Sequence, residues 1–239
     1  MSGLTINNSG VHWERIGDIR VAVWPKDAQP DAARLTEILP PESLEQIRHL
    51  THGGRRGEWL ATRVLSVWVT GDLPSKGEVG EPIWKNGLHG SITHKGGHVA
   101  LCFASDPRVT CGLDLELCRD LDPGVRSKIM NADEWRLCED VFGSGDGVKS
   151  ASTLVFAAKE AIYKALFPLV GKVFWFEAVE MMDLMVTGDT ATLSFRLCKD
   201  LSPAVSAGMN IRANAKISRL GGVAHWLVVA SHAKIGHSE

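Results

Sequence analysis

Two acidic residues stand two positions apart in the segment Gly112 to Leu117, which reads GLDLEL. On a β-strand, residues i and i+2 share one face, so Asp114 and Glu116 point one way, and Leu113, Leu115 and Leu117 point the other. Two carboxylates held this close repel each other unless a cation lies between them, and a hard divalent ion with oxygen ligands is the usual partner. The segment predicts a divalent metal site, and the alternative is an exposed strand face whose acids are solvated.

A third acid stands in the middle of an aromatic stripe. Residues 156–167 (FAAKEAIYKALF) predict a helix on which Glu160 lies among aromatic side chains, with Lys159 and Lys164 on its flanks. The stripe consists of Phe156, Tyr163 and Phe167. A carboxylate in that position needs a partner, which is either Lys164 one turn later or the same metal, with both lysines then facing phosphate oxygens. The residues alone leave both readings open.

Basic and hydroxyl groups offer a binding site for an anion. Arg55, Arg56 and Arg63 cluster with one tryptophan on one side of a predicted helix, and the loop over residues 90–97 (GSITHKGG) adds Thr93 and His94 beside glycines. Glycines let a ligand approach the backbone, and such a loop at the end of a strand suits a phosphate. The alternatives are a solvated helix face and a polar hairpin turn.

The elements that must position these groups form an α+β pattern. We expect strands near Ile19–Trp24, Ser91–His94, His98–Ala104 and Val109–Leu117, and helices near 41–50, 55–69, 120–138 and 153–167, the last ended by Pro168. Residues 73–90 and 143–147 are predicted to be loops, and four more strands are expected at 175–181, 191–198, 210–217 and 224–230. Without a regular βαβ alternation, two α+β lobes of similar size are predicted.

The composition limits the class of protein. The chain has 239 residues, 44% of them hydrophobic, and a formal net charge of −2, so no overall field favours nucleic acid. Five cysteines without a CxxC indicate reduced thiols rather than a disulfide framework or a zinc knuckle. Neither a signal peptide nor a membrane span is predicted, so we expect a cytoplasmic protein.

Common catalytic motifs are absent from the sequence. The segment 143–150 (GSGDGVKS) departs from a phosphate-binding loop because Val148 stands where glycine precedes the lysine, and no HExxH or GxSxG occurs. The residues thus show no activated nucleophile belonging to the protein itself.

Four motifs together resemble a known family. The order RRGEWLATR, GSITH, GLDLE and FAAKEAIYKALFP, from Arg55 to Pro168, is similar to the Sfp-type 4'-phosphopantetheinyl transferases, in particular the bacterial enterobactin-synthase component D branch. The resemblance implies a monomer of two pseudo-symmetric α+β lobes, residues 1–117 and 118–239, with coenzyme A in the cleft between them. It also implies transfer of the phosphopantetheine arm of CoA to a serine of an apo acyl, peptidyl or aryl carrier protein, with release of 3',5'-ADP.

The resemblance also implies roles for single residues. Metal ligands would be Asp114, Glu116 and Glu160, holding Mg²⁺, or Mn²⁺, which accepts the same oxygen set. The CoA-binding residues would be Arg55, Arg63, Thr93, His94, Asp114, Lys159 and Lys164. The catalytic residues would be Glu160, as general base, and Lys164, near the transferred group.

One position departs from the family. Val79 stands where members often have a basic residue before a Gly-x-Pro turn, so Lys76 or Lys85 is expected to make that CoA contact instead. For the carrier, a basic and apolar surface is expected within 125–135, and an ordinary amphipathic helix is the alternative.

Two other functions fit parts of the pattern. A CoA- or nucleotide-binding module without turnover would keep the pocket, but the intact acids and Lys159 argue against it. A divalent-metal phosphohydrolase would use the acids and leave the basic helix and the GSITH loop without a role.

Overall fold

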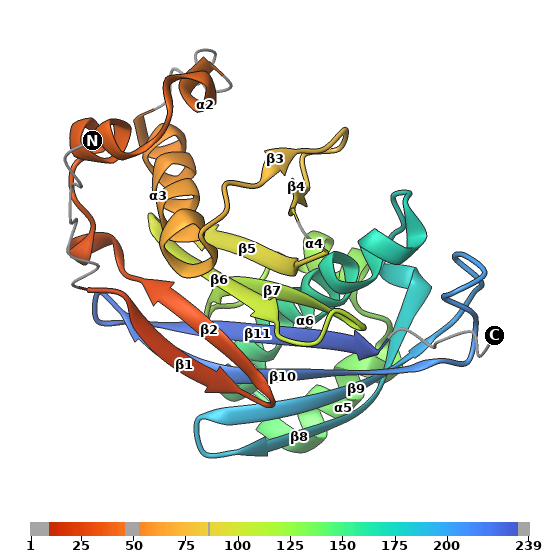
Figure 1. The fold of residues 1–239 in the computed structure, drawn as a ribbon. Coiled ribbons are helices and arrows are strands. Elements are labelled where there is room, and N and C mark those ends of the chain that lie inside the picture. The colour runs from red at the N-terminus through yellow and green to blue at the C-terminus, as the bar shows by residue number, and fades with distance from the viewer. Residues whose placement is uncertain (1–9, 46–52, 86, 234–239) are drawn as a thin grey trace.

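The computed structural model describes residues 10–45, 53–85 and 87–233, and its main elements are two antiparallel sheets with helices on their outer faces (Figure 1). The first sheet has the order β1-β2-β6-β5 and the second the order β7-β11-β10-β9-β8. The first contains β1 (His12–Ile16), β2 (Ile19–Trp24), β5 (His89–Lys95) and β6 (His98–Ala104). The second contains β7 (Val109–Leu117), β8 (Val179–Thr187), β9 (Thr190–Leu197), β10 (Asn210–Leu220) and β11 (Val223–Ala233). A short antiparallel pair, β3 (Ser75–Lys76) and β4 (Pro82–Ile83), lies between β2 and β5 in the sequence.

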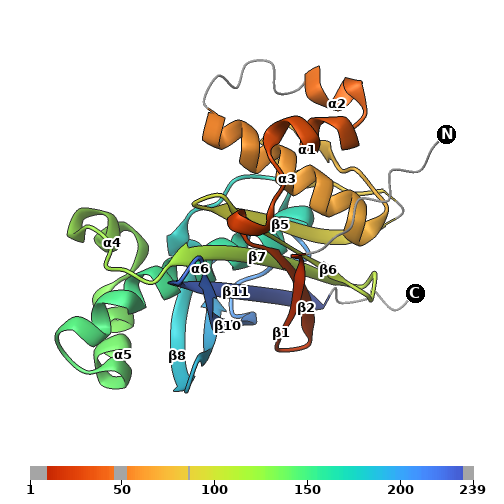
Figure 2. The same cartoon turned by 90° about the vertical axis from the view of Figure 1, so that its left-hand side faces the viewer.

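The helices divide into two groups along the chain. The first group is α1 (Ala32–Ile38), α2 (Pro41–Glu45) and α3 (Gly53–Thr70), and the second is α4 (Pro123–Ile129), α5 (Ala132–Phe142) and α6 (Asp146–Val170). Two short 3₁₀ turns occupy Lys26–Ala28 and Phe176–Ala178. Figure 2 shows α1 to α3 together at one end of the molecule and α4 and α5 at another.

The central strands of the first sheet, β2 and β6, are covered on both faces, because consecutive residues along them are apolar and buried. In β2, Ala22 and Trp24 pack with Leu60 and Val64 of α3. The other face of the same strand, with Val21, lies in a core shared with the second sheet. Leu113 and Leu115 of β7 belong to that shared core, so these two leucines, which alternate with the acids, are held inside the protein, as the alternation predicts.

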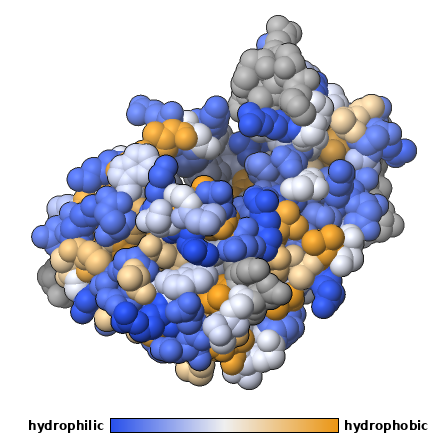
Figure 3. All heavy atoms as spheres, turned by 180° about the vertical axis from the view of Figure 1, so that it is seen from behind, coloured by the Kyte–Doolittle hydropathy of each residue, from blue (hydrophilic) through white to orange (hydrophobic). Residues whose placement is uncertain are grey.

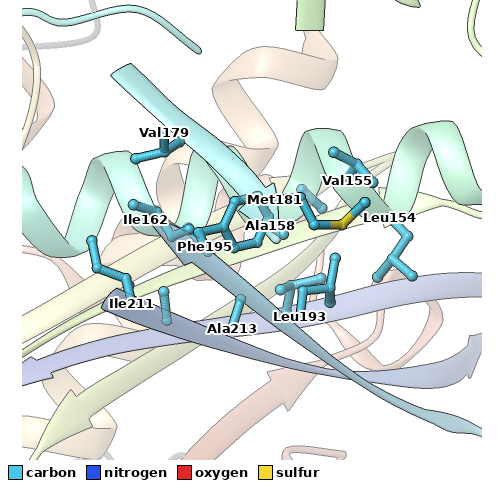
Figure 4. Packing of buried hydrophobic residues seen from close by; sticks show 14 of the residues in the cluster. Leu154, Val155, Ala158, Ile162, Val179, Met181, Leu193, Phe195, Ile211 and Ala213 are labelled. Atoms are coloured by element: carbon cyan, nitrogen blue, oxygen red, sulfur yellow. The ribbon is translucent and has the colours of Figure 1, made fainter. Parts of the chain in front are cut away.

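The second sheet packs its other face against α6 (Figure 4). Side chains of α6, among them Ala158 and Ile162, meet Phe195 of β9 and Ala213 of β10. Complete burial of α6 on this side fixes its rotation about its own axis. Any polar group that α6 presents to β7 is therefore held in one place.

Most predicted elements agree with the structure, and the predicted α+β class is confirmed. The strands expected at Ile19–Trp24, His98–Ala104 and Val109–Leu117 have the predicted bounds, and the helix expected over 55–69 lies within α3. The helix expected over 41–50 is described only as α2, since residues 46–52 lie outside the described part of the chain. The division into lobes at residue 117 stays a prediction, and in the structure β7 pairs with β11 of the second sheet.

Several predicted boundaries were wrong. The last long helix, α6, begins at Asp146 instead of residue 153, so it includes part of the predicted loop over 143–147. Pro168 does not end α6, which continues to Val170 and ends at Gly171 with φ of 67°; a proline three residues from the end removes one backbone bond but leaves the preceding turns intact. The helix expected over 120–138 is two helices separated by Asn131, whose side chain caps α5. The strand expected from Trp175 begins only at Val179, after a 3₁₀ turn, and the predicted loop over 73–90 contains β3 and β4.

Figure 3 shows hydrophobic side chains scattered among hydrophilic ones on the face seen from behind. Among the described residues, no helix combines the length and the apolar character needed to cross a membrane.

Candidate active site at the contact of β7 and α6

A glycine allows β7 to lie directly against α6. A Cβ atom at Gly112 would overlap the carbonyl oxygen of Ala161 and lie 2.5 Å from the amide nitrogen of Ala165. Real Cβ atoms do not approach backbone this closely, so any side chain at Gly112 would push the two elements apart. The close contact brings the acids that follow Gly112 next to the polar groups of α6.

Asp114 is the most enclosed acid of the site. Its side chain is buried, and its Oδ1 atom accepts hydrogen bonds from Lys164 Nζ at 2.6 Å and Thr93 Oγ1 at 3.1 Å. The Lys164 ammonium also donates to the carbonyl oxygen of Leu113, at 3.0 Å. The second carboxylate oxygen, Oδ2, is buried and has no hydrogen-bond partner within the described part of the chain. A buried carboxylate oxygen without a partner is unfavourable, and a bound cation would remove that cost.

Glu116 pairs with a lysine that the sequence reasoning did not single out. Lys95 Nζ lies 2.6 Å from Glu116 Oε2, and the Glu116 side chain is 12% exposed. Thr93 and Lys95 are two positions apart and share one face of β5, and Asp114 and Glu116 likewise share one face of β7. The two faces meet, so Thr93 contacts Asp114 and Lys95 contacts Glu116. The pattern around GSITHK could have indicated Lys95, since it shares the face of Thr93.

Glu160 is the third acid of the site. Burial raises the pKa of its carboxyl group; Lys164 lowers it, and the nearby charges of Asp114 and Glu116 raise it. These electrostatic interactions place all three predicted metal ligands in one region of the protein. No ion pair within the described residues is recorded for Glu160, whereas Asp114 and Glu116 each have an ammonium group at 2.6 Å.

The charges and oxygen atoms of the acid cluster decide whether it can hold a divalent cation. Within residues 10–45, 53–85 and 87–233, no three acidic, histidine or cysteine side chains converge closely enough to hold a metal ion together. Three carboxylates face two ammonium groups here, which leaves one net negative charge. Together with the unpartnered Asp114 Oδ2, this charge and the carboxylate oxygens suit a hard cation such as Mg²⁺.

Lys159 lies on a different side of α6 from the acids. Its side chain is 3% exposed, and its ammonium donates to Ile129 O at 2.7 Å and contacts both carboxylate oxygens of Glu134, at 2.7 and 3.0 Å. Glu134 also accepts hydrogen bonds from the backbone amides of Asn131 and Met181. The ammonium thus joins α4, α5 and β8, and its expected contact with CoA phosphate stays a prediction.

The helix α3 contributes one buried cation near the first sheet. The Arg63 side chain is largely buried, its guanidinium lies 5.0 Å from the centre of the Trp59 ring, and burial lowers its pKa. No hydrogen bond or ion pair to Arg63 is recorded among the described residues. A cation enclosed in this way without a carboxylate partner suits an anionic ligand.

His94 is held by α3 rather than by the acids. Its Nδ1 atom lies 3.1 Å from Glu58 Oε2, and Glu58 Oε1 accepts a hydrogen bond from the amide of Gly97 at 2.9 Å. Glu58, which sequence reasoning missed, therefore ties α3 to the turn after β5. Its position five residues before Arg63, within RRGEWLATR, is the only signal in the sequence.

The remaining predicted anion contacts lie outside the acid cluster. Arg55 is exposed near the start of α3, and nothing in the described structure joins it or Arg63 to Asp114, Glu116 or Glu160 by a hydrogen bond or ion pair. Of the two lysines proposed to replace the contact at Val79, Lys85 lies 3.5 Å from Asp72 and Lys76 is exposed.

Two cavities meet at Tyr163, beside the acids. The larger, of about 590 Å³, is lined by the β3–β4 segment, the start of β5 and the C-terminal half of α6, including Lys164. The smaller, of about 270 Å³, is lined by Glu160 and by residues 173–176, among them Trp175. Tyr163 borders both, and burial raises the pKa of its hydroxyl. A long ligand whose charged centre lies at the acids would have a largely apolar recess on either side.

Comparison with known proteins places these residues within one family model. Residues 110–210 match the model of the 4'-phosphopantetheinyl transferase superfamily, which covers β7, α6 and all three acids. The chain is 33% identical over 158 residues to 4'-phosphopantetheinyl transferase Npt of Nocardia iowensis, a match covering 64% of this chain and 66% of that protein. It is 32% identical over 135 residues to enterobactin synthase component D of Escherichia coli K12, covering 51% of this chain and 61% of that one.

A third relative gives a shorter match. The 4'-phosphopantetheinyl transferase PptT of Mycobacterium tuberculosis is 35% identical over 103 residues, which are 43% of this chain and 44% of that protein. The chain thus spans from less than half to about two thirds of the length of the curated relatives it matches.

Proposed function

Since residues 110–210 of this chain are a 4'-phosphopantetheinyl transferase superfamily domain, we propose that the protein transfers the phosphopantetheine arm of coenzyme A to a serine of an apo carrier protein, with release of 3',5'-ADP. The observation that carries this proposal is the meeting of Asp114, Glu160 and Lys164 at the contact of β7 and α6. These three are among the charged residues of the GLDLE and KEAIYKA motifs, drawn from segments about fifty positions apart.

Asp114, Glu116 and Glu160 would hold the divalent cation. When bound, Mg²⁺ supplies neutralisation of the negative charge that collects on the diphosphate oxygens as the bond to the leaving group breaks. The unpartnered oxygen of Asp114 and the excess negative charge of the cluster support this assignment.

Lys164 is the residue of this chain best placed to bind a phosphate oxygen. Its ammonium is anchored by Asp114 and the Leu113 carbonyl, and its side chain remains 26% exposed on the larger cavity. An ammonium fixed before the substrate arrives stabilises developing negative charge without reorganisation during the reaction.

Glu160 would accept the proton of the attacking serine hydroxyl, directly or through a water molecule. A carboxylate whose pKa is raised by burial is a stronger base than an exposed one, and this shift brings it closer to working pH. The serine oxygen then forms a bond to the β-phosphorus of CoA, the bond from that phosphorus to the bridging oxygen breaks, and 3',5'-ADP leaves with its electron pair. The nucleophile belongs to the partner, which agrees with the absence of an activated serine or cysteine motif in this sequence.

The remainder of CoA would extend to both sides of the acids. Arg63, which has no recorded acidic partner among the described residues, is proposed to bind the 3'-phosphate, with Arg55, Thr93 and His94 nearby on α3 and β5. The aromatic recess around Trp175 begins at Glu160 and is proposed to receive the apolar pantetheine arm.

The carrier-docking surface, the monomeric state and a cytoplasmic location remain proposals. In the predicted docking segment, Val125 is 46% exposed and Arg126 stacks on Trp135 at 4.1 Å. An apolar and basic surface of this kind suits an acidic helix of a carrier.

Mass measurement of a carrier protein tests the proposal. The protein is incubated with CoA, Mg²⁺ and apo acyl, peptidyl or aryl carriers, and we expect at least one carrier to gain a single phosphopantetheine group, with loss of the gain when the metal is chelated. No gain with any of the three carrier classes refutes the proposal. Glu160→Gln is expected to bind CoA but to lose transfer by about 10²–10⁴-fold, whereas Lys199→Met, which removes an exposed lysine paired with Glu177, serves as the control.

A further inference from the structure

Lys95 occupies a position beside Glu116 where its charge opposes a metal ion. Its ammonium lies 2.6 Å from Glu116 Oε2, and Mg²⁺ binds carboxylate oxygen at about 2.1 Å. Two cations on one carboxylate oxygen would lie within about 5 Å of each other, where like charges repel strongly in a partly buried site. The ion pair and a metal ion on the same oxygen therefore oppose each other.

The three acids of the site are not equally available to a metal. Asp114 still has a buried oxygen without a partner among the described residues, and Glu160 has no recorded ammonium contact there. Asp114 can keep Lys164 on Oδ1 while its Oδ2 binds the metal, whereas Oε2 of Glu116 becomes open to a metal only when the Lys95 ammonium moves away. Metal binding at this oxygen of Glu116 thus requires the displacement of Lys95, and the free energy of that displacement opposes metal binding.

Once it leaves Glu116, the Lys95 ammonium can move toward solvent and contact a bound ligand. Lys95 is the last residue of β5, its side chain is 30% exposed, and two glycines with positive φ follow it. The four-carbon stem lets the ammonium move toward solvent without moving the strand. A diphosphate bound over the acids would give it a new anionic partner.

We propose that Lys95 couples metal binding to coenzyme A binding: it neutralises Glu116 in the metal-free protein, and it moves to the diphosphate when metal and CoA enter together. The inference rests on the proposed function for the identity of the diphosphate ligand, but not for the competition at Glu116. Lys95 therefore weakens the binding of metal alone but not the binding of metal in the presence of CoA, and because coupling between two ligands is reciprocal, bound metal strengthens CoA binding by the same factor.

Manganese titration followed by electron paramagnetic resonance measures this coupling directly. Mn²⁺ affinity is determined for the unmodified protein and for Lys95→Met, each with and without CoA. We expect Lys95→Met to bind Mn²⁺ alone at least about 5-fold more tightly, the factor that corresponds to loss of a partly exposed ion pair of about 1 kcal/mol. The ratio of the Mn²⁺ dissociation constants without and with CoA should fall by a similar factor.

Matched variants separate this coupling from a general effect of charge. Lys95→Arg keeps the positive charge and should retain the coupling of the unmodified protein, and Lys199→Met removes a lysine from the exposed pair with Glu177 and should change neither affinity. Should Lys95→Met fail to fold by circular dichroism, Lys95→Gln replaces it with the same expectation.

Three results would overturn the inference: Mn²⁺ affinities of Lys95→Met within twofold of the unmodified protein, weaker Mn²⁺ binding in the variant, or no measurable Mn²⁺ binding by either. The failure of this inference can be distinguished from that of the proposed function. Carrier modification with unchanged Mn²⁺ affinities refutes only the role of Lys95, and the expected Mn²⁺ shift without modification of any carrier refutes only the transferase.

Discussion

Lys159→Met is expected to lower the free energy of unfolding by about 3–5 kcal/mol, because it removes one partner of a buried ion pair. Lys159 and Glu134 are 3% and 1% exposed, and the ammonium contacts both carboxylate oxygens and the carbonyl of Ile129. Methionine fills a similar volume but leaves the Glu134 charge without its counter-ion. For a chain of this length, the loss corresponds to a fall in Tm of about 6–20 °C.

A second change should restore most of that stability. In the double variant Glu134→Gln with Lys159→Met, the amide oxygen can accept only one of the two backbone hydrogen bonds that Glu134 accepts, from Asn131 or from Met181, but no charge remains buried. Replacing both members of a buried pair is far less costly than removing one. We expect the double variant to lie within about 2 kcal/mol of the unmodified protein by thermal and urea unfolding.

The same double variant decides whether Lys159 contacts CoA. The Lys159 ammonium already has three acceptors in the structure, so its removal should have little effect on CoA binding. The CoA affinity of the double variant, measured by calorimetry, should stay within about threefold of that of the unmodified protein, a difference of about 0.7 kcal/mol. Lys199→Met, in an exposed pair, should change Tm by little. A Tm of Lys159→Met equal to that of the unmodified protein would contradict the structural role, and a tenfold loss of CoA affinity in the stable double variant would assign Lys159 to the phosphate.

Three further outcomes follow from the site and its surroundings. Gly112→Ala should lower the free energy of unfolding, measured with urea, by about 1–3 kcal/mol, because the new Cβ pushes β7 away from α6. It should also reduce the rate of transfer more than the affinity for CoA, and an unchanged free energy of unfolding would contradict the close contact. Arg63→Leu should weaken CoA binding at least tenfold but leave 3'-dephospho-CoA binding nearly unchanged in calorimetry, and an equal loss for both ligands would refute the 3'-phosphate assignment. In the folded protein at pH 8, a thiol reagent should modify exposed Cys198 first and leave Cys138 unreactive, because burial raises the pKa of Cys138 to about 12. The modified cysteines are identified by peptide mass, and fast labelling of Cys138 would show that α5 opens.

The sequence predicted that Asp114 and Glu116 share one face of a strand, because that arrangement depends only on neighbouring residues. Residues two apart on a strand share a face whatever the strand packs against, and this rule alone separates Asp114 and Glu116 from the buried leucines. The same rule applied to β5 would have placed Lys95 beside Thr93. What it could not supply is that β5 lies next to β7, since β5 and β7 belong to different sheets in the structure.

Lys159 shows where local reasoning fails. It precedes Glu160 by one position, so on a helix the two side chains point about 100° apart. The helical pattern therefore gives the direction of Lys159 but not its surroundings, which come from α4, α5 and β8. Its carboxylate partner, Glu134, lies 25 positions away in the sequence, and only tertiary packing brings the two together.

The spacing of small residues on α6 belongs to the site as much as its charges do. Gly112 meets the backbone of Ala161 and Ala165, which are one helical turn apart, and these alanines alternate with Glu160 and Lys164 along the helix. A larger side chain at any of the three small positions would increase the distance between β7 and α6, and the 2.6 Å contact of Lys164 with Asp114 depends on that distance. The GLDLE and KEAIYKA motifs thus specify a packing contact together with a set of charges. A variant that kept every charged residue but enlarged Ala161 would be expected to lose the site.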